Sequence, residues 1–152
     1  MSRIKKIIAN NKKASFNYFL ENRLEVGIVL VGSEVKSLRS GKVNIEDSYA
    51  SNQNNEIILY NANISSYDKA SYQNHDPKRP RKLLLHKLEI KKFIGKIKQK
   101  GYTIVPTSIY FNEKGLVKLE IALASGKKLH DKRQVIKDRD WQREKRTILK
   151  MK

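Results

Sequence analysis

Hydrophobic and polar residues alternate along several short stretches of this chain, which is the pattern of half-buried β-strands. The clearest stretch is LVKLEIALA, residues 116–124, where every second residue from Val117 to Leu123 is apolar. One face of this strand is expected in the core, and the other, which carries Lys118, in solvent. Strands are predicted over residues 16–20, 24–32, 48–53, 56–65, 102–111 and 116–124.

Two polar segments are predicted to reverse the chain between neighbouring strands. Asn54-Asn55 separates residues 48–53 from 56–65 and has the length of a hairpin turn. Residues 112–115, NEKG, separate the last two predicted strands in the same way. Pro106 falls inside a predicted strand, and because proline has no N–H to donate, we expect it at a sheet edge or a bulge.

Helical periodicity is confined to two stretches. Residues 33–41, SEVKSLRSG, predict a short helix with Ser33 at its N-cap and Gly41 just past its C-terminus. Residues 87–100 predict a longer helix, because apolar residues recur at helical spacing from Ile90 to Ile97 and Gly101 ends the pattern. Together the elements predict a mainly β (α+β) fold, a small closed OB-like barrel of about six antiparallel strands with two or three helices.

The net charge of +18 and the isoelectric point of about 10.1 indicate the class of partner. Such a balance points to a polyanion: nucleic acid, an anionic membrane surface or the ribosome. No apolar run reaches the roughly 18 residues needed to span a bilayer, and the N-terminus lacks the apolar core of a secretory signal, so a cytoplasmic location is expected. The chain has no cysteine, which excludes a disulfide framework and a thiolate metal site.

The positive charge is concentrated in three segments. Residues 1–13 carry five Lys/Arg and no acid, residues 78–100 carry ten and one, and residues 126–152 carry eleven and four. The rest of the chain has seven bases and ten acids. A near-neutral body with three basic segments is typical of an RNA-binding scaffold. At 152 residues the chain fits one domain, so we assign residues 1–125 to an OB-like RNA-binding barrel with a basic N-terminal arm and residues 126–152 to a basic tail.

The sequence offers no catalytic or metal-binding pattern. His75, His86 and His130 are widely separated, and none belongs to an HExxH pattern. No Gly-rich phosphate loop is present, and Glu46-Asp47 is better explained as turn chemistry than as an acid/base pair. We expect a binding protein and not an enzyme, with no cofactor and no metal.

The basic block KRPRK, residues 78–82, is a candidate RNA contact in the body of the protein. As a phosphate-contacting ridge it would use Arg79 and Arg81 for bidentate contacts and Lys78 and Lys82 as point charges. The alternative is a solvated basic loop.

Two acids and one base in the predicted strands and first helix each have two interpretations. Glu25 and Glu34 lie among β-branched residues, where a carboxylate could accept hydrogen bonds from RNA or pair with a lysine. Lys118 could contact RNA, although a lysine on the solvent face of a strand is more often ordinary surface.

The tail is GKKLHDKRQVIKDRDWQREKRTILKMK, residues 126–152. Its apolar residues Ile136, Trp141, Ile148 and Leu149 are spaced for a patchy amphipathic helix and not for a wide core stripe. Three arrangements compete: a helix docked on the barrel, a helix on a membrane surface, and a segment that folds on RNA. The third is favoured because Lys and Arg recur along the whole length, and the rings of Trp141 and His130 could then stack on unpaired bases.

Several long blocks of this sequence resemble one known family. They are NKKAS and NYFL in residues 11–20, EVGIVLVGSEVKSLRSGKVNIEDSYA, NHDPKRPRKLLLHK, KGYTIVP, and GKKLHDKR followed by IKDRDWQREKR. The blocks run in the family's order from about Asn11 to Arg146, nearly the full chain, and GSEVKSLRSGK and RPRKLLLHK are highly specific. The chain resembles the SsrA-binding proteins, which partner transfer-messenger RNA in bacterial ribosome rescue.

The resemblance implies an OB-like barrel that grips the tRNA-like domain of transfer-messenger RNA, one copy of the chain per RNA. Four positions match family residues that are important for this binding: Asn11, Glu25, Leu84 and Lys118. Less specifically assigned backbone contacts are Lys36, Arg39, Arg81, Lys82, Lys127 and Lys128.

The resemblance also implies the ribosome as a second partner. Family tails are disordered when free and helical on the ribosome, where they lie in the empty mRNA channel. His130 matches a residue that stacks on a decoding-centre base, and Trp141, Ile148 and Leu149 match positions linked to tag-peptide accommodation. Residues that match the rRNA-contacting pattern are Asp131, Lys132, Arg133, Lys137, Arg139 and Arg143.

Two dipeptides depart from the family pattern. Ser15-Phe16 stands where relatives commonly have Arg-His, and Asn22-Arg23 replaces a stretch that is usually acidic. Both departures bear on affinity and not on family membership. The alternative function is a structural ribosomal protein or general RNA chaperone with an OB barrel, which would bind RNA with loose selectivity.

Overall fold

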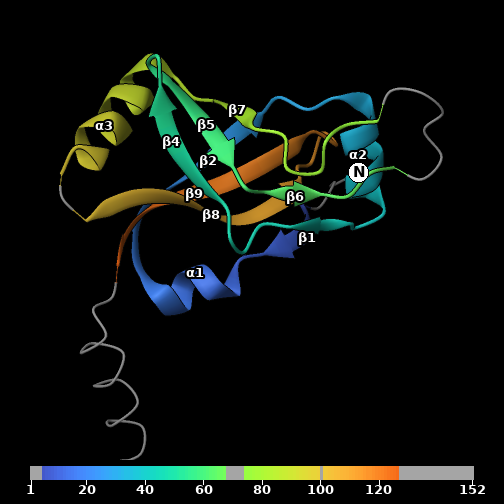
Figure 1. Cartoon of the computed structure of the whole chain (residues 1–152), viewed down its shortest axis with the longest axis horizontal. Coiled ribbons are helices and arrows are strands. Elements are labelled where there is room, and N and C mark those ends of the chain that lie inside the picture. Colours follow the sequence, from blue (N-terminus) through green and yellow to red (C-terminus); the bar gives the residue numbers. More distant parts are fainter. Residues whose placement is uncertain (1–4, 68–73, 100, 127–152) are drawn as a thin grey trace, which may run out of the picture.

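Figure 1 shows the computed structural model of the chain, which describes residues 5–67, 74–99 and 101–126. The predicted basic tail lies outside the described residues from Lys127 onward. The described elements are β1 (Lys6–Asn10), α1 (Lys12–Asn17), β2 (Tyr18–Ile28), α2 (Gly32–Arg39), β3 (Val43–Asn44), β4 (Tyr49–Gln53), β5 (Glu56–Tyr60), β6 (Asn63–Ile64), β7 (Arg81–Leu84), α3 (Lys87–Ile97), β8 (Tyr102–Phe111) and β9 (Val117–Gly126).

Six of these strands pair into one closed antiparallel ring. Around the ring the order is β8, β4, β5, β7, β2 and β9, and β9 closes it by pairing with β8. β1 pairs with the C-terminal half of β8, whereas β4 pairs with β8 at Ile104. α2 and α3 lie at opposite ends of the molecule in Figure 1. The predicted mainly β fold, with a closed set of about six antiparallel strands, is confirmed.

The core fills the inside of the ring with apolar side chains that alternate along the strands. α3 covers part of this core with Phe93, which is buried, and with Ile90, Ile94 and Ile97, which are partly buried. The helical spacing of these four residues is therefore explained by packing. Fully buried side chains from the ring include Ile57, Leu59, Leu83, Ile104, Leu119 and Ile121.

Three turn and bulge predictions are confirmed. Asn54 and Asn55 have φ angles of 51° and 61°, the left-handed pair that a type I′ hairpin turn requires. The β8–β9 register shifts between Pro106 and Ser108, so the proline lies at a bulge. Gly41 has φ 73° and follows Ser40, the C-cap of α2.

The segment predicted as a strand over residues 16–20 is instead the end of α1 and the start of β2. Asn11 decides this, because its Oδ1 accepts a hydrogen bond from the Ala14 N–H at 3.0 Å and so caps the helix. α1 then packs on the outside of β8 and β9, where Ala14, Val105 and Ala124 form a second buried cluster. The predicted solvent face of residues 116–124, which included Ala122, is therefore wrong at its end, because Ala122 and Ala124 are both buried.

Other local predictions are also corrected. Val31, and not Ser33, is the N-cap of α2, because its N–H donates to Glu34 Oε1 at 2.9 Å and the Ser33 hydroxyl bonds to His75 Nδ1 at 2.8 Å. The strand predicted over residues 56–65 ends at Tyr60, since Asn61 has φ 65°. The pattern does not predict β1 or β7. No helix in the described parts of the chain has the length and apolar character needed to cross a membrane.

Candidate nucleic-acid interface

A row of three residues crosses the outer face of β7, β2 and β9. Gly27 of β2 is the register partner of Leu84 on one side and of Lys118 on the other. Leu84 is 52% exposed, which is unusual for a leucine in a strand that is paired on both sides. Gly27 leaves the space that Leu84 uses, because a Cβ at this glycine would lie 3.2 Å from Leu84 Cβ. The row combines an apolar side chain with a cation.

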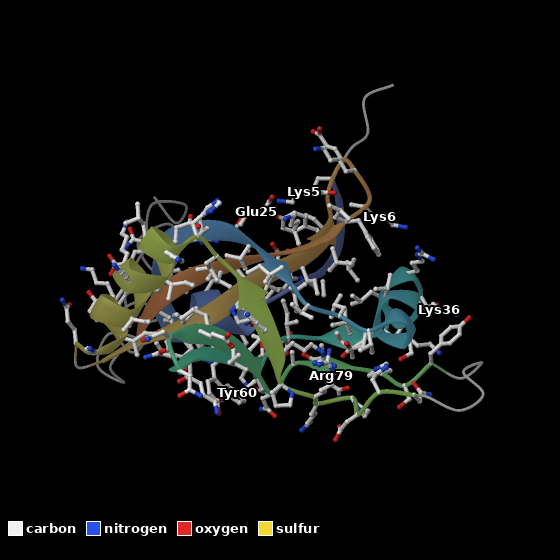
Figure 2. All side chains as sticks on the ribbon, turned by 90° about the horizontal axis from the view of Figure 1, so that it is seen from above. Lys5, Lys6, Glu25, Lys36, Tyr60 and Arg79 are labelled. Atoms are coloured by element: carbon white, nitrogen blue, oxygen red, sulfur yellow. The ribbon has the colours of Figure 1, made fainter. Side chains whose placement is uncertain are left out.

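A carboxylate and a second lysine lie on the same side of the ring. The Tyr110 hydroxyl donates a hydrogen bond to Glu25 Oε2, and Lys5 Nζ lies 3.9 Å from the centre of the Tyr110 ring. Tyr110 is in turn the register partner of Lys118. All four residues line one cleft of about 450 Å³ between the N-terminal arm and the β8–β9 hairpin. Lys5 and Glu25 lie side by side in Figure 2.

The hydroxyl of Tyr110 stays protonated and donates its hydrogen bond to Glu25. Tyr110 is only 1% exposed. Its burial, followed by the hydrogen bond to Glu25 and the charge of that carboxylate, raises the pKa of Tyr110 far above its ordinary value. The hydroxyl therefore keeps its proton across the physiological range and holds the exposed carboxylate in one orientation.

A second ionised carboxylate lies beside this cleft. Burial opposes the ionisation of Glu120, but hydrogen bonds from Thr107 Oγ1 at 2.9 Å and Arg23 Nη1 at 3.0 Å outweigh it, so the pKa of Glu120 is lowered. Arg23 belongs to Asn22-Arg23, one of the two dipeptides that depart from the family pattern, and its charge is neutralised by Glu120. This arginine therefore adds less free positive charge to the face than its position suggests.

The KRPRK block divides into an interior and an exterior half. Arg81 is fully buried, and its Nε bonds to Glu34 Oε2 at 2.5 Å. Its Nη1 donates to the Ala62 carbonyl at 2.9 Å and its Nη2 to the Pro77 carbonyl at 3.1 Å. In this structure the Arg81 side chain is therefore not exposed to RNA phosphate. Arg81 ties β7 to α2 and to the chain on either side of β6.

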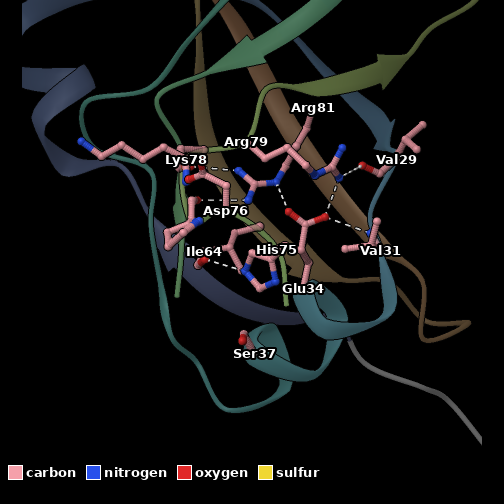
Figure 3. A network of polar contacts seen from close by, with 12 residues as sticks. Val29, Val31, Glu34, Ser37, Ile64, His75, Asp76, Lys78, Arg79 and Arg81 are labelled. Carbon is pink, nitrogen blue, oxygen red and sulfur yellow. Dashed lines mark hydrogen bonds and ion pairs between the residues drawn. The ribbon is translucent and has the colours of Figure 1, made fainter. Parts of the chain in front are cut away.

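Glu34 is the centre of this buried network (Figure 3). Arg79 Nη2 donates to Glu34 Oε1 at 2.6 Å, so two arginines converge on one carboxylate. Burial opposes the charge on Glu34, yet hydrogen bonds from Arg79, the Val31 N–H and Arg81 lower its pKa overall. Of the two interpretations of Glu34, pairing with a cation is the one observed, although the cation is arginine. Arg79 Nε is buried and has no hydrogen-bond partner among the described residues.

The remaining predicted contacts differ in accessibility. Asn11 is buried, and its Nδ2 donates to the Pro106 carbonyl at 2.8 Å and the Ile45 carbonyl at 3.2 Å, so it shapes the fold and offers no surface to RNA. Lys36 and Arg39 are exposed on α2, and Lys82 is exposed beside Glu56 at 3.1 Å. Lys127, Lys128 and the predicted ribosome-binding residues, from His130 to Leu149, lie outside the described residues.

Sequence reasoning missed three contributors to this face: Lys5, Gly27 and Tyr110. Tyr110 looks like an ordinary strand residue, and only the pairing of β8 with β9 brings it to Glu25 of β2. A glycine in a strand can mark a close approach of another chain segment, and that signal was present at Gly27.

Among the described residues, no three His, Asp or Glu side chains are placed to hold a metal ion.

The face formed by Leu84, Glu25, Lys118 and Lys5, called the β2 face below, has the chemistry of an RNA-binding module. Lysines attract phosphates, a fixed carboxylate accepts from ribose hydroxyl and base amino groups, and an exposed leucine can contact a base or ribose. Comparison with known proteins then gives the family. A family model described as "SmpB protein" matches residues 8–151, so the chain belongs to the SmpB family.

Two relatives of this chain share one description. The SsrA-binding protein of Rickettsia canadensis (strain McKiel) is 60% identical over 152 residues, which is the whole of both chains. The SsrA-binding protein of Rickettsia bellii (strain RML369-C) is 58% identical over the same length. A chain in a solved structure named "tmRNA-SmpB: a journey to the center of the bacterial ribosome" is 46% identical with a TM-score of 0.69, covering 84% of this chain and 93% of that one.

Proposed function

We propose that this protein binds the tRNA-like domain of transfer-messenger RNA and delivers it to stalled ribosomes for trans-translation. The observation that carries the proposal is the shared fold, at 46% identity, with a chain of a tmRNA–SmpB ribosome structure. A relative named SsrA-binding protein, 60% identical over the full length, supports it. The chain acts by binding and positioning RNA, without catalysis of its own, and it works in the cytoplasm, where ribosomes are.

The β2 face is the proposed docking surface for the tRNA-like domain. Lys118 and Lys5 provide point charges for phosphates, which bring the RNA to this face and account for much of its affinity. Glu25, held by Tyr110, accepts hydrogen bonds from groups that only a correctly oriented RNA presents. Leu84 lies over Gly27 and offers an apolar contact to a base or ribose.

The basic tail is the proposed sensor of the empty mRNA channel. Its eleven Lys/Arg compete for the same rRNA surface that mRNA covers, so an occupied channel excludes the tail by sterics and by charge. His130 and Trp141 supply rings for stacking on unpaired rRNA bases. Since β9 ends at Gly126, the first residue of the tail, docking of the body fixes where the tail starts.

The RNA that co-purifies with the full chain tests this proposal. One predominant transfer-messenger RNA is expected, together with a clear preference for the isolated tRNA-like domain over an unrelated tRNA in a filter-binding titration. A broad RNA mixture and equal affinities would contradict the proposal. That result would favour a general RNA chaperone or a structural ribosomal protein.

A further inference from the structure

Arg23 and Glu120 form an exposed ion pair beside the cleft of the β2 face. Arg23 Nη1 lies 3.0 Å from Glu120 Oε1, and the two side chains are 54% and 27% exposed. A pair this open to solvent is weak, because water and salt screen the attraction between its charges. A competing anion can therefore take the guanidinium at little cost.

The course of β2 places Arg23 on the outer face of the ring. The β2–β9 register shifts between Glu21 and Leu24, and Asn22 has φ 54° within this irregularity. Leu24 packs against the core, so its neighbours Arg23 and Glu25 both point outward. Arg23 therefore shares a face with the carboxylate that is proposed to accept hydrogen bonds from RNA.

Glu120 adds a second negative charge to this face. It is the register partner of Glu25, and like charges directly opposite each other in a sheet repel. The pKa of Tyr110 is raised by burial, by Glu25 and, in addition, by the charge of Glu120. Glu120 therefore acts on the same hydroxyl that orients Glu25, and without Arg23 its charge would repel an RNA phosphate from the β2 face.

Glu120 keeps other partners if Arg23 leaves it. Thr107 Oγ1 donates to Glu120 Oε1 at 2.9 Å, and this is the same oxygen that Arg23 contacts. Burial opposes the ionisation of Glu120, but hydrogen bonds from Thr107 and Arg23 and the charges of Arg23 and Lys5 lower its pKa overall. The contributions of Thr107 and Lys5 do not depend on the arginine, so release of Arg23 leaves the carboxylate with a hydrogen bond and a nearby cation.

A phosphate is an anion that fits the position of the Glu120 carboxylate. The planar guanidinium of arginine matches carboxylates and phosphates with the same fork of N–H donors. Lys5 and Lys118 provide point charges for phosphates on this face, so phosphates of a docked RNA lie close to the ion pair.

We propose that an RNA phosphate displaces Glu120 from Arg23 when the tRNA-like domain docks, which makes Arg23 a further contact of the β2 face. Glu120 then sets how much affinity this contact adds, because breaking the ion pair offsets part of the new attraction. The inference rests on the proposed function. It adds a residue that the family resemblance does not supply, since Asn22-Arg23 replaces a stretch that is usually acidic.

The salt dependence of RNA binding tests this exchange, because its slope reports the number of phosphates contacted. A filter-binding titration of the full chain with the isolated tRNA-like domain gives the slope of log affinity against log salt. Arg23→Gln should reduce the magnitude of this slope by about 0.7–0.9, the value for one phosphate. Arg23→Lys should keep the wild-type slope, because the charge remains. An unchanged slope in Arg23→Gln would overturn the inference, since Arg23 would then stay on Glu120 in the complex.

Glu120→Gln distinguishes exchange from an ion pair that persists in the complex. Glutamine still offers an acceptor to Thr107 but carries no charge. Binding should become about threefold tighter, in keeping with the small contribution of an exposed pair, and the slope should not change. A steeper slope would show a phosphate contact that the wild type lacks, and weaker binding would show that Glu120 itself supports the RNA. Either result would overturn the inference.

Lys13→Gln is the matched control, because Lys13 also belongs to an exposed ion pair, with Asp47 at 2.7 Å, and does not line the cleft of the β2 face. It should leave the slope for the tRNA-like domain unchanged. An equal fall in Lys13→Gln and Arg23→Gln would indicate a general effect of net charge and overturn the inference. Thermal melting by circular dichroism establishes that each variant is folded.

An unrelated tRNA separates this inference from the proposed function. If the wild type prefers the tRNA-like domain and Arg23→Gln keeps the full slope, the inference fails and the proposed function stands. If the wild type binds both RNAs equally and the slope still falls in Arg23→Gln, the proposed function fails and the phosphate contact of Arg23 stands.

Discussion

Gly27 and Leu84 are register partners on β2 and β7, and the missing side chain of the glycine is what lets the leucine lie over the outer face of the ring. A Cβ at Gly27 would approach Leu84 Cβ to 3.2 Å and Leu84 Cδ1 to 3.3 Å, closer than almost all real contacts. The position of an exposed RNA-contact candidate therefore depends on a residue that makes no contact of its own.

We expect Gly27→Ala to weaken binding of the tRNA-like domain about as much as Leu84→Ala does, because the new methyl group displaces the leucine. The loss should be several-fold in a filter-binding titration. Gly95→Ala is the control, because a Cβ there meets no other atom within 4 Å. That change should leave binding unaltered and stabilise α3 by roughly 0.5–1 kcal/mol. Full affinity in Gly27→Ala would show that the leucine position is unimportant.

Tyr110→Phe removes the hydroxyl that orients Glu25 and keeps the ring under Lys5. We expect the affinity for the tRNA-like domain to fall about fivefold, which is about 1 kcal/mol, because Glu25 is no longer held in one orientation. Tyr102→Phe is a matched control, because Tyr102, whose pKa is raised by Glu21, does not line this cleft. A double substitution with Glu25→Gln should lose no more than the larger single effect if both residues act through one contact.

Glu34→Ala should be far more harmful than loss of a surface ion pair, because it leaves Arg79 and Arg81 without their counter-charge in or near the interior. The expected cost is about 3–5 kcal/mol in the free energy of unfolding, measured by urea denaturation. Glu56→Ala, which breaks the exposed pair with Lys82, should cost less than about 1 kcal/mol. Similar losses in the two variants would contradict the buried network.

Ionisation of the Glu34 carboxylate makes the free energy of unfolding depend on pH, and the direction of its pKa shift gives the sign. The folded pKa of Glu34 lies below its ordinary value of 4.5. As the pH falls, the unfolded chain therefore takes up this proton before the folded chain does. The stabilisation from the ionised carboxylate is fully present above about pH 4.5 and is lost as the pH falls through the folded value. The stability difference between wild type and Glu34→Gln should thus be constant near neutral pH and shrink below it, as thermal melts can measure.

A chain that ends at Ser125 should bind the tRNA-like domain normally and fail to support tagging on stalled ribosomes. The reason is that the β2 face is complete without the tail, whereas the channel-filling residues are removed. Gel-shift affinity and a tagging assay measure the two properties separately. Unchanged tagging would contradict the two-part function.

Family membership and the partner class could be read from the sequence because they depend on residue types in order. The blocks around GSEVKSLRSGK and RPRKLLLHK, and the concentration of lysine and arginine in three segments, needed no coordinates. The sequence also predicted local backbone geometry where the conformational preference of one or two residues determines it. Asn54-Asn55 indicated a hairpin turn and Pro106 a sheet edge or a bulge, because their backbone preferences leave few alternatives.

The candidate site was harder to predict, because a lysine or arginine in a short basic run gives no sign of which way it points. KRPRK looked like one exposed ridge, yet alternation along β7 turns Arg81 inward and leaves Lys82 outside. Asn11 was assigned to RNA binding by resemblance, and the structure uses its amide to cap α1 and to bind two carbonyls.

The amino-acid sequence by itself determined the period of burial in the strands, the turns, the cationic character and the family of this protein. Only the tertiary structure decided which side chains meet, because closure of the ring joins strands that are far apart in the chain. That closure brings Tyr110 to Glu25, and the position of α2 against the ring brings Glu34 to Arg81. A local pattern shows which residues of a strand face inward. It does not show which distant segments pair, because that pairing depends on how the whole chain packs.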